Sequence, residues 1–206
     1  MNAYNTKGKQ FIGAINELVK DEGRENYDVL FETLNSISLK DGVHLGLKLA
    51  SERGLGDESC FYTVKNGVAP SRGKEPLFIN AVFPDLKVEK SEMGAWQAYL
   101  LFVSPTILPV FWHGGYICRD YFFDASDVDM FNQESYEDTP ELSVDEIPEP
   151  SVAVEDDKYV VSCAYWNDWE GLVRETVRVK FLKNGDVKIL VPKQKVLKRY
   201  NCGICY

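Results

Sequence analysis

The strongest constraint on the fold is an alternation of side-chain types between residues 172 and 182. The apolar positions are Val173, Val177, Val179 and Phe181, and the polar positions between them are Arg174, Thr176, Arg178 and Lys180. Successive side chains of a β-strand point to opposite faces. The pattern therefore predicts a strand with one buried face and one cationic face.

Two further strand-like runs flank this segment, at residues 159–166 and 187–191. The first turn between runs covers residues 167–171, and the second contains Asn184 and Gly185, a pair favoured in type I′ hairpins. The last fifty residues are thus expected to form a three-stranded antiparallel β-meander.

In the N-terminal part, the spacing of apolar residues changes along the chain. Apolar residues recur at helical spacing in residues 6–20 and 27–37, which predicts a helical hairpin. Shorter β-favouring runs follow at residues 43–49, 60–64 and 77–83. We expect these runs to form a sheet that the meander completes.

The middle of the chain gives weaker signals. Residues 91–103 fit either a helix or a buried strand, because periodicity does not separate the two. Residues 107–123 flank Gly114 and Gly115, a pattern typical of a hairpin. Ser126 is expected to cap a short helix that ends near Phe131.

A single α+β domain spanning residues 1–206 is the expected architecture, with the helical hairpin packed on a mostly antiparallel sheet. Its candidate internal boundary is the stretch 134–157, which has ten acidic residues, three prolines and no Lys or Arg. This composition favours a long exposed connection.

Charge and cysteine content narrow the class of protein. The net charge is −9, and residues 158–206 carry ten basic against four acidic residues (+6), which leaves −15 for residues 1–157. Nucleic-acid binding is therefore not expected, and a basic protein partner is. No apolar run suits a signal peptide or a membrane span, and Cys60, Cys118 and Cys163 resemble reduced core residues. These features favour a cytoplasmic protein.

The turn between the first two meander strands is the preferred binding site. It is rich in aromatic and acidic side chains, namely Trp166, Asn167, Asp168, Trp169 and Glu170. Tryptophan is enriched in binding hot spots, and the two carboxylates suit a basic partner. The alternative is that one or both indoles fold back over the end of the sheet core.

A second candidate binding site is Trp112 with His113, near Cys118, Arg119 and Asp120. An imidazole near a thiol is the chemistry of a nucleophilic pair, but no nucleophile elbow surrounds it. The alternative role for His113 is that of a hydrogen-bonded turn residue.

Cys202 and Cys205 have the spacing of a zinc knuckle or a redox disulfide. No second pair supplies the remaining zinc ligands, so we expect no bound metal and no cofactor. Whether these two thiols bind metal or form a disulfide stays open.

The motifs of common enzyme classes do not occur in the sequence. The leading hypothesis is a non-enzymatic protein-binding module with an acidic surface, of the kind found among inhibitors and immunity-type proteins. The alternative is a small-molecule-binding domain or enzyme with a cleft between the helices and the sheet.

Overall fold

The computed structural model describes residues 2–20, 26–49, 59–68, 83–108 and 118–203. The α-helices are α1 (Ala3–Lys20), α2 (Leu30–Thr33), α3 (Glu92–Val103) and α4 (Ala125–Glu134). Short 3-10 turns are η2 (Phe83–Asp85), η3 (Ser104–Thr106) and η5 (Val144–Glu146). The strands are β1 (Ile37–Leu39), β2 (Val43–Lys48), β3 (Cys60–Lys65), β4 (Leu86–Val88), β5 (Asp120–Phe122), β6 (Ser151–Glu155), β7 (Lys158–Asn167), β8 (Gly171–Phe181), β9 (Val187–Ile189) and β10 (Lys193–Arg199).

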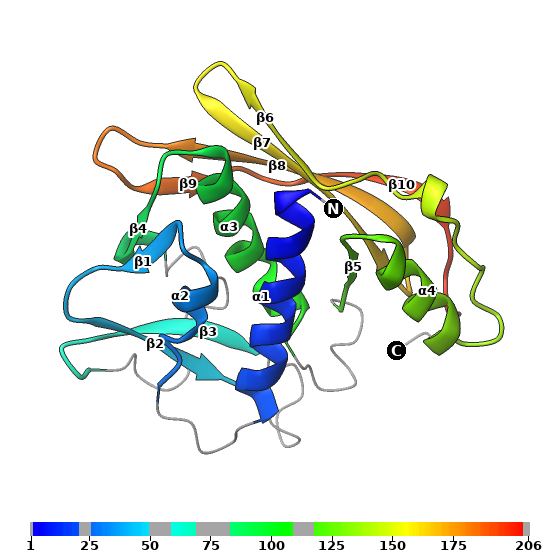
Figure 1. The fold of residues 1–206 in the computed structure, drawn as a ribbon, viewed down its shortest axis with the longest axis horizontal. Helices are drawn as coiled ribbons and strands as arrows, with labels where there is room; N and C mark the ends of the chain where they lie inside the picture. The colour runs from blue at the N-terminus through cyan, green and yellow to red at the C-terminus, as the bar shows by residue number, and fades with distance from the viewer. Residues whose placement is uncertain (1, 21–25, 50–58, 69–82, 109–117, 204–206) are drawn as a thin grey trace.

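The chain is an α+β protein whose C-terminal part forms a six-stranded antiparallel sheet (Figure 1). Its central order is β10-β8-β7-β5, with β6 beside β7 and β9 beside β8. The predicted meander is confirmed as β7, β8 and β9. Strand β10, which the sequence analysis did not predict, pairs with the first half of β8.

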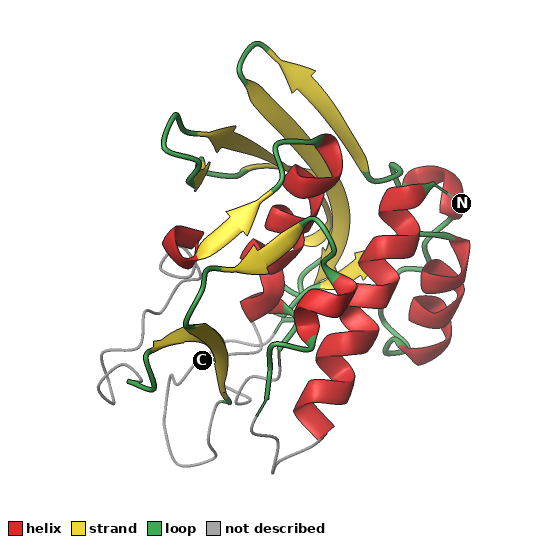
Figure 2. Cartoon of the chain, turned by 60° about the vertical axis from the view of Figure 1, so that its left-hand side comes forward, coloured by secondary structure: helices red, strands yellow, loops and turns green. Residues whose placement is uncertain are grey.

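Helix α3 covers one face of this sheet, which we call the inner face. It contacts β6, β7 and β8 on one side and β1 and β4 on the other, so it lies between the large sheet and the pair β1–β4 (Figures 1 and 2). Val173, Val177 and Val179 are fully buried on this face, as the alternation in β8 predicts. Glu175 has the same orientation and is 1% exposed.

The opposite, outer face of the sheet is partly covered by α4 and residues 142–147. A second apolar cluster, separate from the main core, forms there from Phe122, Val128, Leu142, Ala164, Trp166 and Leu172. The expectation that 134–157 is wholly an exposed connection is therefore wrong. Leu142 is buried, and Ser151–Glu155 form β6 on the edge of β7.

Two turn predictions are also corrected. Of Asn184 and Gly185, only Gly185 has a positive φ (85°), so the turn is not type I′, which needs two such residues. Asp124 rather than Ser126 caps α4, because its side chain accepts the amide of Ser126 and Asp127 completes a capping box.

The N-terminal half follows its predicted order with two changes. The meander does not complete a sheet begun by the N-terminal strands, because β2 and β3 form a two-stranded sheet of their own, as do β1 and β4. Helix α1 and strands β2 and β3 form where expected, but the second helix is a single turn and Ile37 begins β1. Residues 91–103 are the helix α3, in which residues on all sides are buried, which explains why no apolar stripe identified it. The run 77–82 and the hairpin tip at 109–117 lie outside the described residues.

Candidate functional site

The turn between β7 and β8 is not the exposed aromatic loop that we expected. Trp166 is 1% exposed, and its indole N–H donates to Asp168 Oδ1 at 2.9 Å. Asn167 is also buried, and its side-chain Nδ2 donates to the backbone carbonyl of Cys118 at 2.8 Å. These contacts hold the turn against the end of the sheet core, which was the alternative interpretation for Trp166.

The other residues of the turn remain accessible to solvent. Asp168 and Trp169 are half-buried, and Glu170 is exposed. Gly171 ends the turn with φ 90°, and a Cβ there would lie 2.1 Å from the Lys198 carbonyl of β10. Glycine is therefore required at this position by both the backbone angle and the neighbouring strand.

The remaining predicted site residues are separated from this turn or lie outside the described residues. Trp112, His113 and Cys205 are outside them, and Cys202 is half-buried with its amide donating to the Asp168 carbonyl at 2.8 Å. Within the ranges that the structure describes, no three side chains are grouped as metal ligands. Cys163 and Cys60 are buried as expected, whereas Cys118 is exposed.

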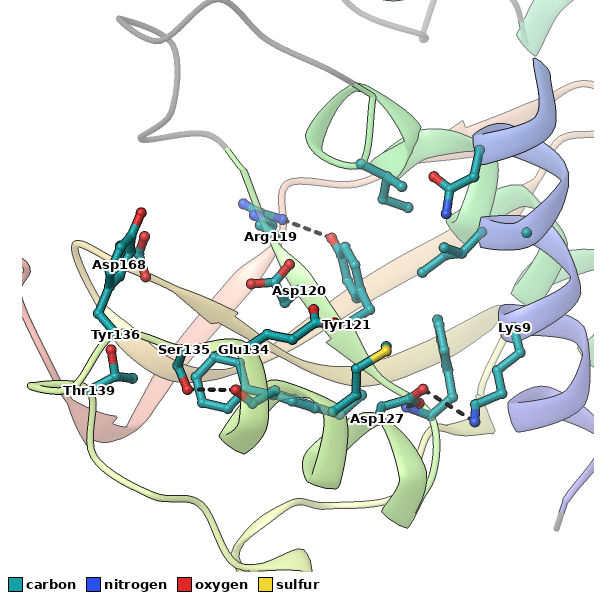
Figure 3. A pocket seen from close by; sticks show the side chains of 18 residues that line it. Lys9, Arg119, Asp120, Tyr121, Asp127, Glu134, Ser135, Tyr136, Thr139 and Asp168 are labelled. Atoms are coloured by element: carbon teal, nitrogen blue, oxygen red, sulfur yellow. Dashed lines mark hydrogen bonds and ion pairs between the residues drawn. The ribbon is translucent and has the colours of Figure 1, made fainter. Parts of the chain in front are cut away.

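A cleft of about 660 Å³ opens beside the turn, between α1, the edge strand β5 and α4. In Figure 3, Lys9 and Asp127 lie at one end of the view and Asp168 at the other, with Asp120 between them. The charged side chains that line it are Lys9, Arg119, Asp120, Asp127, Glu134 and Asp168. They come from α1, from the neighbouring elements β5 and α4, and from the turn between β7 and β8.

One end of the cleft is closed by an ion pair between α1 and the start of α4. Lys9 Nζ lies 2.7 Å from Asp124 and 3.2 Å from Asp127. Asp127 Oδ2 also accepts the amides of Phe123 and Asp124, which fixes the carboxylate where β5 meets α4. Burial alone would lower the pKa of Lys9, but its bonds to Asp124 and Asp127 outweigh this and raise it. The positive charge of Lys9 is thus already neutralised.

Arg119 is neutralised in the same way at the floor of the cleft. Its guanidinium donates to both oxygens of the buried Glu175, at 3.3 and 3.2 Å, and lies 4.3 Å from the ring centre of Tyr165. Tyr99 and Gln194 donate to the same carboxylate at 3.3 Å each. The network satisfies a charged group inside the core and leaves Arg119 unavailable as a free cation.

The remaining charged side chains of the cleft are Asp120, Glu134 and Asp168, and they have no ion-pair partner among the described residues. The pKa of Asp120 is raised, first by partial burial in the cleft and then by the negative charges of Asp168 and Glu134. Among the described residues, no cation forms an ion pair with any of these three carboxylates. Partial desolvation on its cleft side and the charges of Asp120 and Asp168 also raise the pKa of Cys118, which makes its thiol a poorer nucleophile.

Strand β5 is an edge strand of the large sheet and lines the cleft. It pairs with β7 through one edge, and in the described part of the chain no strand pairs with the other. The Arg119 amide points away from β7 and donates to the Thr106 carbonyl at 3.0 Å. Backbone groups alternate in direction along an antiparallel strand, so the amide and carbonyl of Tyr121 also face away from β7.

No protein-family model, curated protein or solved structure matches this chain. None of the helices in the described ranges is both long and apolar enough to cross a membrane.

Sequence reasoning identified Asp168 but missed most of the cleft. Lys9, Asp127 and Glu134 lie on helices, and no local motif distinguishes them from other charged residues. Asp120 was noted only as a neighbour of His113. The useful signal was the acidic start of α4, since an Asp cap three residues before a second Asp marks a helix N-terminus.

Proposed function

We propose that the cleft between α1, β5 and α4 binds a basic, extended segment of a partner protein. The observation that carries the proposal is the crowding of Asp120, Glu134 and Asp168 without a cation partner among the described residues. Nearby negative charges disfavour the ionised form of a carboxylate, and Asp168 and Glu134 act in this way on Asp120. An arriving Lys or Arg side chain relieves that repulsion.

The shape of the cleft supports an extended peptide as its occupant. In the described part of the chain no strand pairs with the second edge of β5, and strand addition at such an edge is a common way of binding an extended segment. Met130 and Tyr136, which are 54% and 79% exposed, line the same cleft and give it an apolar part. Such side chains are typical anchors at protein interfaces.

A cytoplasmic inhibitor or immunity-type protein is the form that this proposal takes. A net charge of −9 steers association with a basic partner, and steering of this kind speeds the encounter. Cys163 is a buried thiol, which suits the reducing compartment that we propose.

The alternative is a small cationic ligand in the same cleft. A volume of about 660 Å³ and a position between helix α1 and the sheet favour it, since ligand pockets commonly have this size. The two proposals share the carboxylates and differ in whether the occupant needs a peptide backbone.

The test is the affinity of a fluorescein-labelled, lysine-rich peptide, measured by anisotropy at several salt concentrations. We expect Asp120→Asn with Glu134→Gln to weaken binding about fivefold at low salt, the scale of two exposed ion pairs. Wild-type affinity should fall as salt rises, because salt screens such pairs.

The control is Glu32→Gln with Glu89→Gln, which removes the same charge from two exposed sites outside the cleft. Equal weakening by both double variants would show that only net charge matters and would refute the cleft as the site. If putrescine, a small diamine, competes at the same concentration as the peptide, the small-ligand alternative holds instead.

A further inference from the structure

The outer face of the large sheet carries a dense set of cations. Register places Lys158, Lys180 and Lys188 side by side across β7, β8 and β9, and Arg174 directly opposite Lys195 of β10. Arg178 and Lys193 lie on the same face, because each is an even number of residues from Arg174 or Lys195 in its strand. Lys198 also lies there, since it pairs with Leu172 of the outer face and binds Glu146. The face is strongly basic in a chain whose net charge is −9.

Half of these cations are neutralised by acidic residues of the chain. Lys158 and Lys180 lie 3.8 and 2.6 Å from Asp157. Arg178 lies 3.3 Å from Glu155, and Lys198 lies 3.1 Å from Glu146. The acidic stretch 134–157 therefore borders the face and covers part of its charge.

The other half have no such partner. Arg174, Lys188, Lys193 and Lys195 are exposed, and among the described residues none of them forms an ion pair or a side-chain hydrogen bond. Arg174 and Lys195 are direct cross-strand neighbours, with Cβ atoms about 5 Å apart in such pairs. Lys193 precedes Lys195 by two residues, about 7 Å along the strand. We call Arg174, Lys193 and Lys195 the outer cluster.

Like charges directly opposite each other destabilise a sheet. The pair Arg174–Lys195 therefore has a cost that no ion pair among the described residues offsets. Thr176, which lies opposite Lys193 and two residues from Arg174, adds a hydroxyl to the same surface. Cations and a hydroxyl on an exposed sheet face suit an anion carried by a macromolecule rather than a ligand enclosed in a pocket.

We propose that the outer cluster binds an acidic segment of a partner protein, through carboxylates placed between Arg174, Lys193 and Lys195. This interaction surface is separate from the cleft and does not depend on its proposed function. Arginine binds carboxylates with two parallel hydrogen bonds, and the two lysines supply point charges beside it.

Size and composition favour an acidic protein over a nucleic acid. Affinity for a phosphate backbone commonly rests on about six to ten phosphate contacts, more than the outer cluster with Lys188 provides. No aromatic ring is exposed on the described part of this face for base stacking. Glu155 and Asp157 at its margin would repel a long polyanion, whereas a short acidic segment avoids them.

The experiment measures binding of a fluorescein-labelled oligo-glutamate peptide to the full chain by anisotropy at low salt. We expect Arg174→Ala with Lys195→Ala to raise the dissociation constant about fivefold, as for two exposed charge pairs. The matched control is Lys90→Ala with Lys183→Ala, two exposed lysines outside the outer face, which should leave the dissociation constant unchanged.

A second measurement separates binding from folding. Because the change removes a like-charge pair, the thermal midpoint of the Arg174→Ala/Lys195→Ala variant should equal or exceed that of wild type. Three results would overturn the proposal: the same peptide affinity in this variant and wild type, tighter binding of a single-stranded oligonucleotide than of the peptide, or wild-type self-association that the variant loses.

Discussion

Replacing Glu175 by Gln tests the buried network beneath the cleft. The carboxylate is 1% exposed and accepts hydrogen bonds from Arg119, Tyr99 and Gln194. Gln keeps the shape and one acceptor but removes the negative charge. Arg119, whose positive charge is held by its surroundings, is then left without a counter-ion.

The expected loss follows from the position of Arg119. Removing one partner of a buried ion pair costs about 3–5 kcal/mol. The Arg119 side chain keeps 19% of its surface exposed at the cleft, so water reaches it and the lower figure of about 3 kcal/mol applies. With about 2.1 cal/mol/K of unfolding entropy per residue over 206 residues, this lowers the melting temperature by about 7 °C.

Urea unfolding followed by tryptophan fluorescence measures this loss. Adding Arg119→Met to Glu175→Gln removes the uncompensated charge and should restore most of the stability, while the Gln oxygen still accepts from Tyr99. A cost below about 1 kcal/mol for Glu175→Gln, or a double variant no more stable than the single one, would refute the reasoning.

Four other changes have predicted signs. Gly171→Ala should lower the free energy of unfolding in urea by about 3 kcal/mol, because it places a non-glycine residue at a positive φ and brings a Cβ against the Lys198 carbonyl. Gly13→Ala should instead stabilise α1 by up to about 1 kcal/mol, because the space around Gly13 is open. Asp124→Ala removes the α4 cap and should cost about 1–2 kcal/mol by the same assay. The raised pKa of Asp120 means that the native state holds its proton longer than the unfolded chain, so the contribution of this group to stability should decline as pH rises above about 4. Asp120→Asn should remove that contribution, so the melting temperature of the variant relative to wild type should increase as pH rises.

The sequence predicts the local pieces of this fold better than their arrangement. Alternation in β8 places Val173 and Val177 in the core, and the same alternation places Glu175 there. The alternation does not identify the ion-pair partner of Glu175, because Arg119 reaches Glu175 only once β5 pairs with β7. Long-range register of this kind has no local signal.

Composition misled the sequence analysis at the acidic stretch. Ten carboxylates and three prolines favour an exposed connection, yet Val152 and Val154 alternate with small residues and form β6. The burial of Trp166 was likewise not predictable from local sequence, because an indole beside a turn can be either exposed or buried. Here it is buried because it packs against Phe131 and Tyr200, which are distant in the sequence. The cleft joins α1, β5 and α4, so only tertiary packing creates it.

The most direct test of the proposed function is the pKa of Asp120 itself, followed by carboxyl NMR with and without the lysine-rich peptide. In the free protein it should lie above the ordinary Asp value, because of partial burial and the charges of Asp168 and Glu134. A bound cation favours the ionised form, so the peptide should lower this pKa and release protons. A pKa that the peptide leaves unchanged, while the peptide binds, would contradict the assignment of the cleft as the binding site.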